Sequence, residues 1–174
     1  MSANILSTYF PEAVSIVLGN DRFSHIVSGV AEGTFVTIAR ETPDTQLVIG
    51  GDMSAMRVRR KNRASTVTVT LMQGSDSNDV FSQILKNDED AMNNDWLFHL
   101  TIKDGSGRSV FFSPQAYIAN MPDISFGTEG DNREWVIQCI DLDSHVGGGG
   151  LLDAASVNTL EDVGYDVAED WKTS

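Results

Sequence analysis

Hydrophobic and polar positions alternate along several short segments of the chain, which is the period of strands with one buried face. The pattern is strictest in residues 65–71, where one face holds Val67, Val69 and Leu71 and the other holds Thr66, Thr68 and Thr70. The threonine face is polar but β-branched. It therefore suits a sheet surface that is either wet or covered by a partner.

Further strands are predicted from shorter alternating or β-rich runs that are separated by turn residues. They cover residues 13–18, 22–30, 34–40, 96–102, 108–113, 115–121 and 133–142. Gly19 and Asn20 form a turn signal between the first two runs, and the DGSG sequence at 104–107 predicts a hairpin. Residues 133–142 have apolar side chains on both faces, which predicts a central strand or one covered by a neighbour.

One amphipathic helix is predicted directly after the threonine strand. Ser75 or Ser77 can cap its first turn by accepting free backbone N–H groups. Its apolar stripe consists of Val80, Phe81, Ile84 and Leu85. The polar and acidic residues at 87–95 dilute this stripe, so we expect an acidic loop there.

Residues 41–56 form a long excursion between two strands, with Pro43, two adjacent glycines and little periodicity. A loop of this length in a compact domain is usually functional or mobile. The pattern as a whole predicts a mainly β fold. We expect an antiparallel β-sandwich or barrel with one packed α-helix and a long inter-strand loop or hairpin.

Composition places the chain among soluble globular proteins. It has 174 residues, 41% hydrophobic and 21% charged, with no apolar run near the roughly 20 residues of a membrane span. The formal net charge of −13 argues against general affinity for nucleic acid as a ligand. It is compatible with a conduit through which nucleic acid slides without sticking.

The basic residues are concentrated in one place. Five of the twelve lie close together as Arg57, Arg59, Arg60, Lys61 and Arg63. In an extended chain, four of these project to one side at intervals of about 6.6 Å. This basic row can pair with acidic residues of the same or another copy, and the natural candidates are Asp88, Glu89, Asp90 and Asp95. A solvated hairpin edge and a phosphate-binding strip are the alternative interpretations.

Composition also changes near the C-terminus. The pattern predicts a β domain over residues 1–146, a glycine linker over 147–150 and an acidic extension over 151–174. The extension has six acidic residues and one basic residue, so disorder is the default expectation. Scattered apolar residues from Leu151 to Val163 nevertheless suggest a docking arm that orders on contact.

Candidate catalytic chemistry is sparse. His25, His99 and His145 are far apart and match no metal-ligand spacing, and Cys139 lies in an apolar run that predicts a buried, inert thiol. Three carboxylates, Asp141, Asp143 and Asp153, lack the glycine and distal glutamate of an EF-hand loop. We expect a protein that is not an enzyme and that uses no cofactor.

Three segments taken together carry a family resemblance. They are RASTVTVTLMQGSDSNDVFSQI, FFSPQAYIANMPDISFGTE and NREWVIQCIDLDSHVGG. Over most of residues 13–148 the chain resembles tail tube proteins of contractile-tailed bacteriophages and related prophage elements. The same architecture is found in type VI secretion and tailocin tubes. The family usually ends near the glycine cluster, so residues 151–174 depart from its pattern.

The resemblance implies a structural virion protein. It would polymerise as stacked hexameric rings into the inner tube of a contractile tail, a conduit for DNA ejection. The implied partners are other copies of the chain, the tail sheath, baseplate and tail terminator proteins, and the tape measure protein. DNA would pass through the lumen without specific binding, no membrane would be involved, and assembly would occur in the host cytoplasm.

In view of this resemblance, the threonine face and the clusters of charged residues are candidate contact surfaces. Thr66, Thr68 and Thr70 are candidates for a lumen or inter-subunit face. The basic row and the acidic residues Asp88, Glu89 and Asp90 are candidates for an inter-subunit or inter-ring interface. Two alternatives remain open: the needle tube of a tailocin or type VI-like apparatus, and a monomeric β-sandwich binding module that uses the long loop as its site.

Overall fold

The computed structural model describes residues 6–173, which divide into two compact units. The sheet unit comprises Ile16–Ile102 and Phe111–Ser144. The terminal unit comprises residues 6–15, 103–110 and 145–173. The fold is mainly β with antiparallel strand pairs, which confirms the fold class predicted from the sequence.

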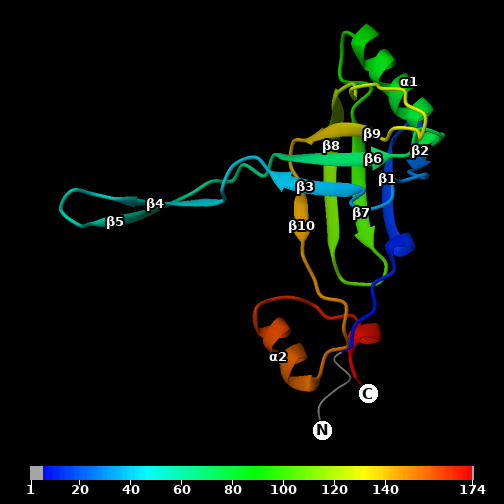
Figure 1. Cartoon of the computed structure of the whole chain (residues 1–174). Coiled ribbons are helices and arrows are strands. Elements are labelled where there is room, and N and C mark those ends of the chain that lie inside the picture. Colours follow the sequence, from blue (N-terminus) through cyan, green and yellow to red (C-terminus); the bar gives the residue numbers. More distant parts are fainter. Residues whose placement is uncertain (1–5, 174) are drawn as a thin grey trace. The chain divides into compact units, whose positions relative to one another are not determined.

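Most strands belong to one sheet. The strands are β1 (Val14–Asn20), β2 (Phe23–Ile26), β3 (Val36–Arg40), β4 (Thr45–Ile49), β5 (Ala55–Arg59), β6 (Ser65–Leu71), β7 (Phe98–Asp104), β8 (Val110–Asn120), β9 (Arg133–Cys139) and β10 (Asp143–His145). The helices are α1 (Ser77–Asp90) and α2 (Ala154–Asp162), with 3-10 turns η1 (Pro11–Ala13) and η2 (Glu169–Trp171). The sheet runs β2-β1-β7-β8-β9-β6-β3, with β10 beside β8, whereas β4 and β5 pair with each other (Figure 1).

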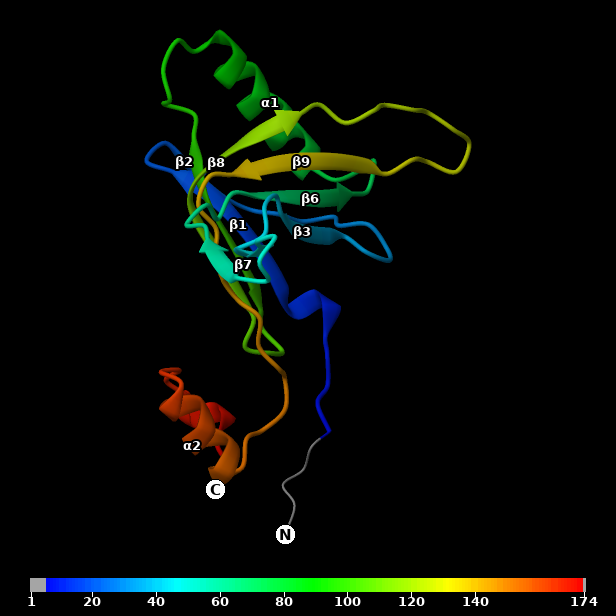
Figure 2. The same cartoon turned by 90° about the vertical axis from the view of Figure 1, so that its left-hand side faces the viewer.

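The core lies between α1 and one face of this sheet. Val67, Val69 and Leu71 of β6 are fully buried, as the alternation predicts. On α1 the buried Phe81 ring meets Trp135 of β9 edge to face, with the ring centroids 5.4 Å apart. The strands β3, β6 and β9 run across the direction of β1 and β7, so the sheet bends strongly (Figure 2).

Two strand predictions need correction. The first turn falls at Asp21 and Arg22, because Gly19 and Asn20 are still paired, with Ser24 and Phe23 of β2. The two strands expected at 108–113 and 115–121 are one strand, β8, which runs through Pro114. The register of β8 with β9 begins at Ala116, so the missing N–H of Pro114 removes no bond from that ladder.

The helix prediction also needs correction at its C-terminal end. The acidic loop was predicted to start at residue 87, which is too early. The helix α1 continues through Asp90, and Ala91 N–H donates to the Asn87 carbonyl at 3.0 Å. The last turn is polar and contributes little to an amphipathic stripe, which is why the pattern missed it. Asp88, Glu89 and Asp90 therefore lie on a helix.

The terminal unit contains the acidic extension, which is folded. Asp153 caps α2 by accepting a hydrogen bond from Ser156 N–H at 2.8 Å, and this lowers the pKa of Asp153. The Arg108 guanidinium lies 4.8 Å from the centroid of the Trp171 ring and donates to the Gly150 carbonyl at 2.7 Å. The glycine run lies against residues 106–109, where Gly147 N–H donates to Ser109 Oγ. Its role as a domain boundary stays a prediction.

Neither helix in residues 6–173 has both the length and the apolar character that crossing a bilayer requires.

Candidate functional site

The long excursion between β3 and β6 is a β-hairpin formed by β4 and β5. Its pairs run from Thr45 opposite Arg59 to Ile49 opposite Ala55. The turn is closed by a hydrogen bond from Gly50 N–H to the Ser54 carbonyl at 2.8 Å. Asp52 at the tip accepts from Ser54 Oγ at 2.6 Å, which lowers the pKa of Asp52. The sequence predicted a long loop or hairpin over residues 41–56, but not the strand register or the continuation of β5 to Arg59.

The outer half of this hairpin is apolar and exposed. Every residue of β4 is exposed, and Leu47, Ile49 and Met56 have 65%, 61% and 59% of their surface accessible. Directly opposed residues share a face of a two-stranded ribbon, so Ile49 and Ala55 lie on one face and Val48 and Met56 on the other. An isolated hairpin is marginally stable in water. The apolar side chains of this hairpin are not covered by the rest of the protomer.

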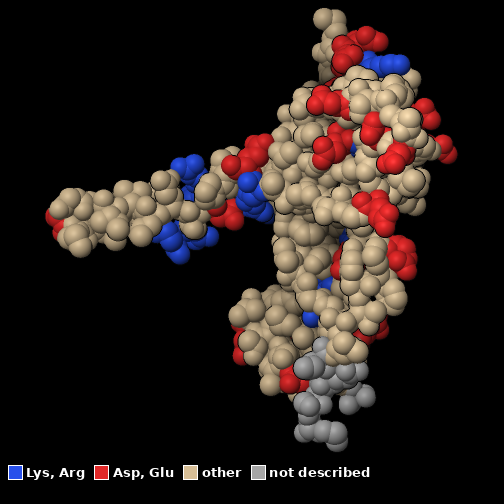
Figure 3. All heavy atoms as spheres, in the orientation of Figure 1, with Lys and Arg blue, Asp and Glu red and all other residues tan. Residues whose placement is uncertain are grey.

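The inner half of the hairpin is basic. A hollow of about 460 Å³ at its base is lined by Arg40, Asp44, Thr45, Arg59, Arg60, Lys61 and Arg63. Three of these cations have partners: Arg40 is paired with Asp44 at 2.7 Å, Arg60 donates to Gln46 Oε1 at 2.9 Å, and Arg63 is paired with Asp141. Figure 3 shows the basic groups gathered on the inner part of the hairpin, with acidic groups spread over the rest of the sheet unit.

The structure divides the predicted basic row. The strand β5 ends at Arg59, so Lys61 and Arg63 do not continue its alternation. Arg63 instead makes a bidentate pair with Asp141, at 2.6 and 3.0 Å, and lies 3.5 Å from Asp143. This pairing raises the pKa of Arg63. Arg57 and Arg59 remain on the exposed hairpin, as the interface prediction requires.

The acidic candidates lie on a different element. Asp88, Glu89 and Asp90 form the last turn of α1, which has no basic residue. Within residues 6–173, no ion pair joins these three carboxylates to the basic row. Asp95, the fourth acidic candidate, pairs with Arg22 at 3.2 Å. Pairing of the α1 carboxylates with another copy therefore stays a prediction.

The threonine face is half-buried and continues onto β9. Thr66, Thr68 and Thr70 are opposite Gln138, Val136 and Glu134 in the antiparallel ladder. Thr66 Oγ1 donates to Glu41 Oε1 at 3.2 Å and lies 3.3 Å from Gln138 Oε1. A shallow pocket on this face is lined by Thr68, Glu134 and Val136 among others. The face is polar, and its role as a lumen or inter-subunit surface stays a prediction.

Burial shifts the pKa of the cysteine and of one histidine. Cys139 is fully buried, and burial raises its pKa to about 11. His25 Nε2 lies 2.9 Å from Ser77 Oγ, and burial lowers the pKa of His25. The described residues contain no group of three or more His, Cys, Asp or Glu that could hold a metal ion.

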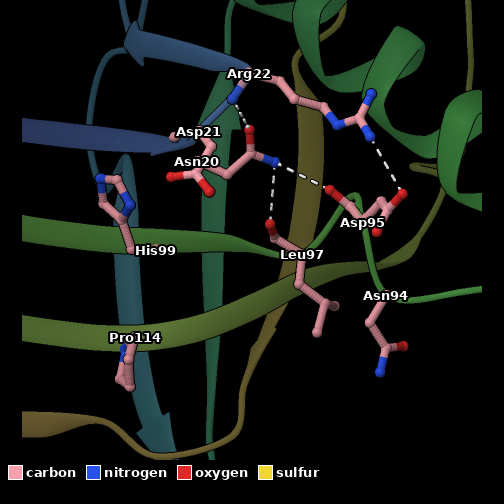
Figure 4. Close-up of a pocket in the computed structure, with 9 residues that line it drawn as sticks. Asn20, Asp21, Arg22, Asn94, Asp95, Leu97, His99 and Pro114 are labelled. Atoms are coloured by element: carbon pink, nitrogen blue, oxygen red, sulfur yellow. Dashed lines mark hydrogen bonds and ion pairs between the residues drawn. The ribbon is translucent and has the colours of Figure 1, made fainter.

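A polar pocket beside the β1–β2 turn was not anticipated from the sequence (Figure 4). Asn20 Nδ2 donates to the Leu97 carbonyl at 3.1 Å, and Asn20 Oδ1 accepts from Arg22 N–H at 2.7 Å. Arg22 in turn reaches Asp95 and stacks over Trp96. These contacts tie the turn to the segment before β7. The Gly19-Asn20 pair was the available signal, but it was interpreted only as a turn.

An apolar groove on the sheet unit was also missed. It runs between β2 and α1, has a volume of about 350 Å³ and is called the β2–α1 groove here. Its apolar walls are Phe23, Val80, Ile84 and Trp96, with Gln83 and Asn87 along the helix side. Val80 and Ile84 belong to the predicted apolar stripe. Their distribution between core and groove depends on how α1 packs, which the stripe alone does not indicate.

Comparisons with known proteins agree with this geometry. The family model described as bacteriophage PhiTE tail tube protein matches residues 7–147. A structural protein, ORF10, of Pseudomonas phage KPP10 is 35% identical over 167 residues, which cover 95% of this chain and 96% of the relative. The cap that terminates the anti-feeding prophage tube is similar in fold, with a TM-score of 0.54 at 10% identity. That match covers 84% of this chain and 96% of the cap chain.

The match to the tube family spans the sheet unit and the hairpin and ends at Gly147, and the phage relative aligns with 95% of this chain, which includes most of the acidic extension. The chain therefore belongs to the bacteriophage PhiTE tail tube protein family and is a structural protein of the phage virion.

Proposed function

We propose that this protein polymerises as stacked hexameric rings that form the inner tube of a contractile tail and conduct DNA during ejection. The observation that carries the proposal is the hairpin, whose apolar outer half is exposed in the protomer. Burial of apolar side chains provides about 25 cal/mol per Å². A neighbouring copy supplies the missing cover, and repetition of this contact builds an assembly.

The sheet supports ring closure in a second way. The strands β2 and β3 end the sheet order, so each has one edge without a strand partner in the described part of the chain. Exposed strand edges invite uncontrolled pairing, and closing them within a ring removes that hazard. A head-to-tail interface between different surfaces generates such rings when its rotation closes.

The charge distribution supports a role as conduit. The net charge of −13 repels phosphate, so DNA passes along a lumen without binding to it. Thr66, Thr68 and Thr70 provide an uncharged polar strip on the exposed face of the sheet, and we assign them to the lumen or to a contact between subunits. The basic hairpin base and the acidic turn of α1 are assigned to contacts between copies.

The further partners belong to the proposal as well. A tube of this kind is enclosed by a sheath, begins on a baseplate, is closed by a tail terminator and holds a tape measure protein. The acidic extension at residues 151–174 is assigned to the outer surface, against the sheath. The 35% identical relative belongs to a phage, which favours a DNA tail over a secretion or tailocin needle.

Electron microscopy of the purified protein tests the proposal. We expect six-fold rings or hollow tubes, with or without addition of an initiating baseplate complex. A species that stays monomeric at high concentration with the initiator present would contradict self-assembly and favour the binding-module interpretation. Rings with another symmetry would contradict the hexamer alone.

A further inference from the structure

The apolar hairpin and the β2–α1 groove are complementary surfaces on different parts of the sheet unit. The hairpin extends away from the sheet and from α1 (Figures 1 and 3), so it does not reach the groove of its own protomer. Resting on the self-assembly proposed above, we propose that the β2–α1 groove receives the β4–β5 hairpin of a second copy. The occupant is therefore the same chain.

The first argument is the match of apolar surface. Leu47 and Ile49 lie two residues apart on one strand and so project from the same hairpin face. Both are more than 60% exposed, and their opposite residues on the paired strand are Arg57 for Leu47 and Ala55 for Ile49. The groove offers Val80 and Ile84 from the helix, together with aromatic walls, as the covering surface.

The second argument is the match of charge. On the same hairpin face, Arg57 lies opposite Leu47 and Arg59 lies opposite Thr45, so cations follow the apolar positions toward the base. On α1, the groove-lining residues are followed by Asp88 and Asp90 in a last turn without basic residues. Arg22 also lines the groove, but it is already paired with Asp95 at 3.2 Å. The carbonyl end of a helix also favours cations.

The spacing of the two patterns agrees. Arg57 lies beside Leu47, about 6.6 Å along the strand from Ile49. Asp88 lies one helical turn beyond Ile84, about 6 Å along the axis. A hairpin that lies along α1 with Ile49 over the groove floor, where Ile84 is 5% exposed, therefore brings Arg57 level with Asp88. β2 borders the same groove, and its edge without a strand partner in residues 6–173 can add main-chain hydrogen bonds to a hairpin strand.

Disulfide trapping tests this docking arrangement. The double variant Leu47→Cys/Gln83→Cys places one thiol on the hairpin and one on the groove side of α1, and both positions are exposed. The control Leu47→Cys/Lys86→Cys uses an exposed position on the other side of α1, which borders a different pocket. The native Cys139 is fully buried and does not compete.

On mild oxidation of assembled protein, we expect covalent ladders on a non-reducing gel for the Gln83 pair and none for the Lys86 pair. Equal ladders for both pairs, or a ladder for Lys86 alone, would overturn the assignment of the groove. Normal tubes without covalent ladders from the Gln83 pair would contradict docking of the hairpin in the groove but would still support self-assembly. A wild-type protein that never assembles would overturn both proposals.

Charge exchange provides an independent measurement. Arg57→Glu and Asp88→Lys should each raise the concentration needed for assembly, on the order of tenfold. The combination Arg57→Glu/Asp88→Lys should return that concentration toward the wild-type value. Lys103→Glu, a reversal of an exposed cation outside the hairpin, is the matched control and should leave it unchanged. Additive losses in the double variant would contradict the Arg57–Asp88 contact.

Discussion

At the scale of single residues, Ser77 links the start of α1 to the segment that follows β2. Its side chain is fully buried, and its Oγ accepts a hydrogen bond from Ser28 N–H at 3.0 Å. The same oxygen lies 2.9 Å from His25 Nε2. Ser75 completes the link, because its Oγ donates to the Ser28 carbonyl at 2.6 Å and accepts from Ser77 N–H at 3.2 Å. The two serines therefore position the start of α1 beside β2.

Replacement of Ser77 tests this role. Ser77→Ala leaves Ser28 N–H and the His25 ring without their partner, so we expect a loss of about 1–2 kcal/mol in the free energy of unfolding. Denaturant unfolding of the monomeric protein measures it. Ser82→Ala on the same helix is the control and should be neutral or slightly stabilising, because alanine has the higher helix propensity. Equal stabilities for the two variants would refute the role of Ser77.

The titration of His25 predicts a pH dependence. Burial lowers the pKa of His25 from its ordinary value of 6.5, so the folded state binds fewer protons than the unfolded state near that pH. Stability linked to His25 is then fully present above about pH 6.5 and is lost as the pH falls below it. Unfolding free energies at about pH 7.5 and pH 5 should therefore differ more in the wild type than in His25→Gln. The same difference in both proteins would contradict the link.

At the scale of secondary-structure elements, the hairpin is the feature that the protomer does not need. Its outer residues are exposed, and its two strands join no other strand in the described residues. The base is closed by a hydrogen bond from Arg60 N–H to the Asp44 carbonyl at 2.8 Å, so residues 44 and 60 are already close. A short turn can therefore replace everything between them.

Replacing residues 45–59 by Asn-Gly should separate folding from assembly. We expect the melting temperature of the monomer to change by less than about 2 °C, because the hairpin contributes little to the core. Assembly should be lost, because the apolar contact with the neighbouring copy is gone. Calorimetry and electron microscopy measure the two properties. Tubes of ordinary appearance would show that the hairpin is dispensable for polymerisation.

At the scale of the whole molecule, the acidic extension is the part that the tube family model does not cover. It is held within the terminal unit by the Arg108–Trp171 stack, and Lys172 pairs with Glu169 at 2.8 Å inside the extension itself. The relative from phage KPP10 aligns with 95% of this chain, so the alignment includes most of the extension. The extension is therefore a candidate for contacts made outside the tube wall.

Deletion of residues 151–174 tests the proposed docking on the sheath. We expect bare tubes to form as in the wild type, because the sheet unit and hairpin are intact. Sheathed tails should be fewer or less stable, which electron microscopy of complemented particles can count. Sheathed tails of normal length and stability would count against the docking role.

The sequence by itself determined the features that depend on one-sided burial along a short segment. The faces of β6, the apolar stripe of α1 and the burial of Cys139 follow from local periodicity, because apolar side chains must leave water wherever the segment packs. The resemblance to tail tube proteins rested on the same strands. Membership of that family was then confirmed by the comparisons.

Only the tertiary structure decided which exposed surfaces are unpartnered. The outer half of the hairpin is apolar on both faces, so it has no alternation to detect, and its pairing depends on a turn that closes it. Arg63 belongs to the basic row in sequence but pairs with Asp141, 78 residues away. The β2–α1 groove exists because α1 packs beside an end strand. Such features depend on contacts between segments that are distant in the sequence, so local patterns of hydrophobicity do not predict them.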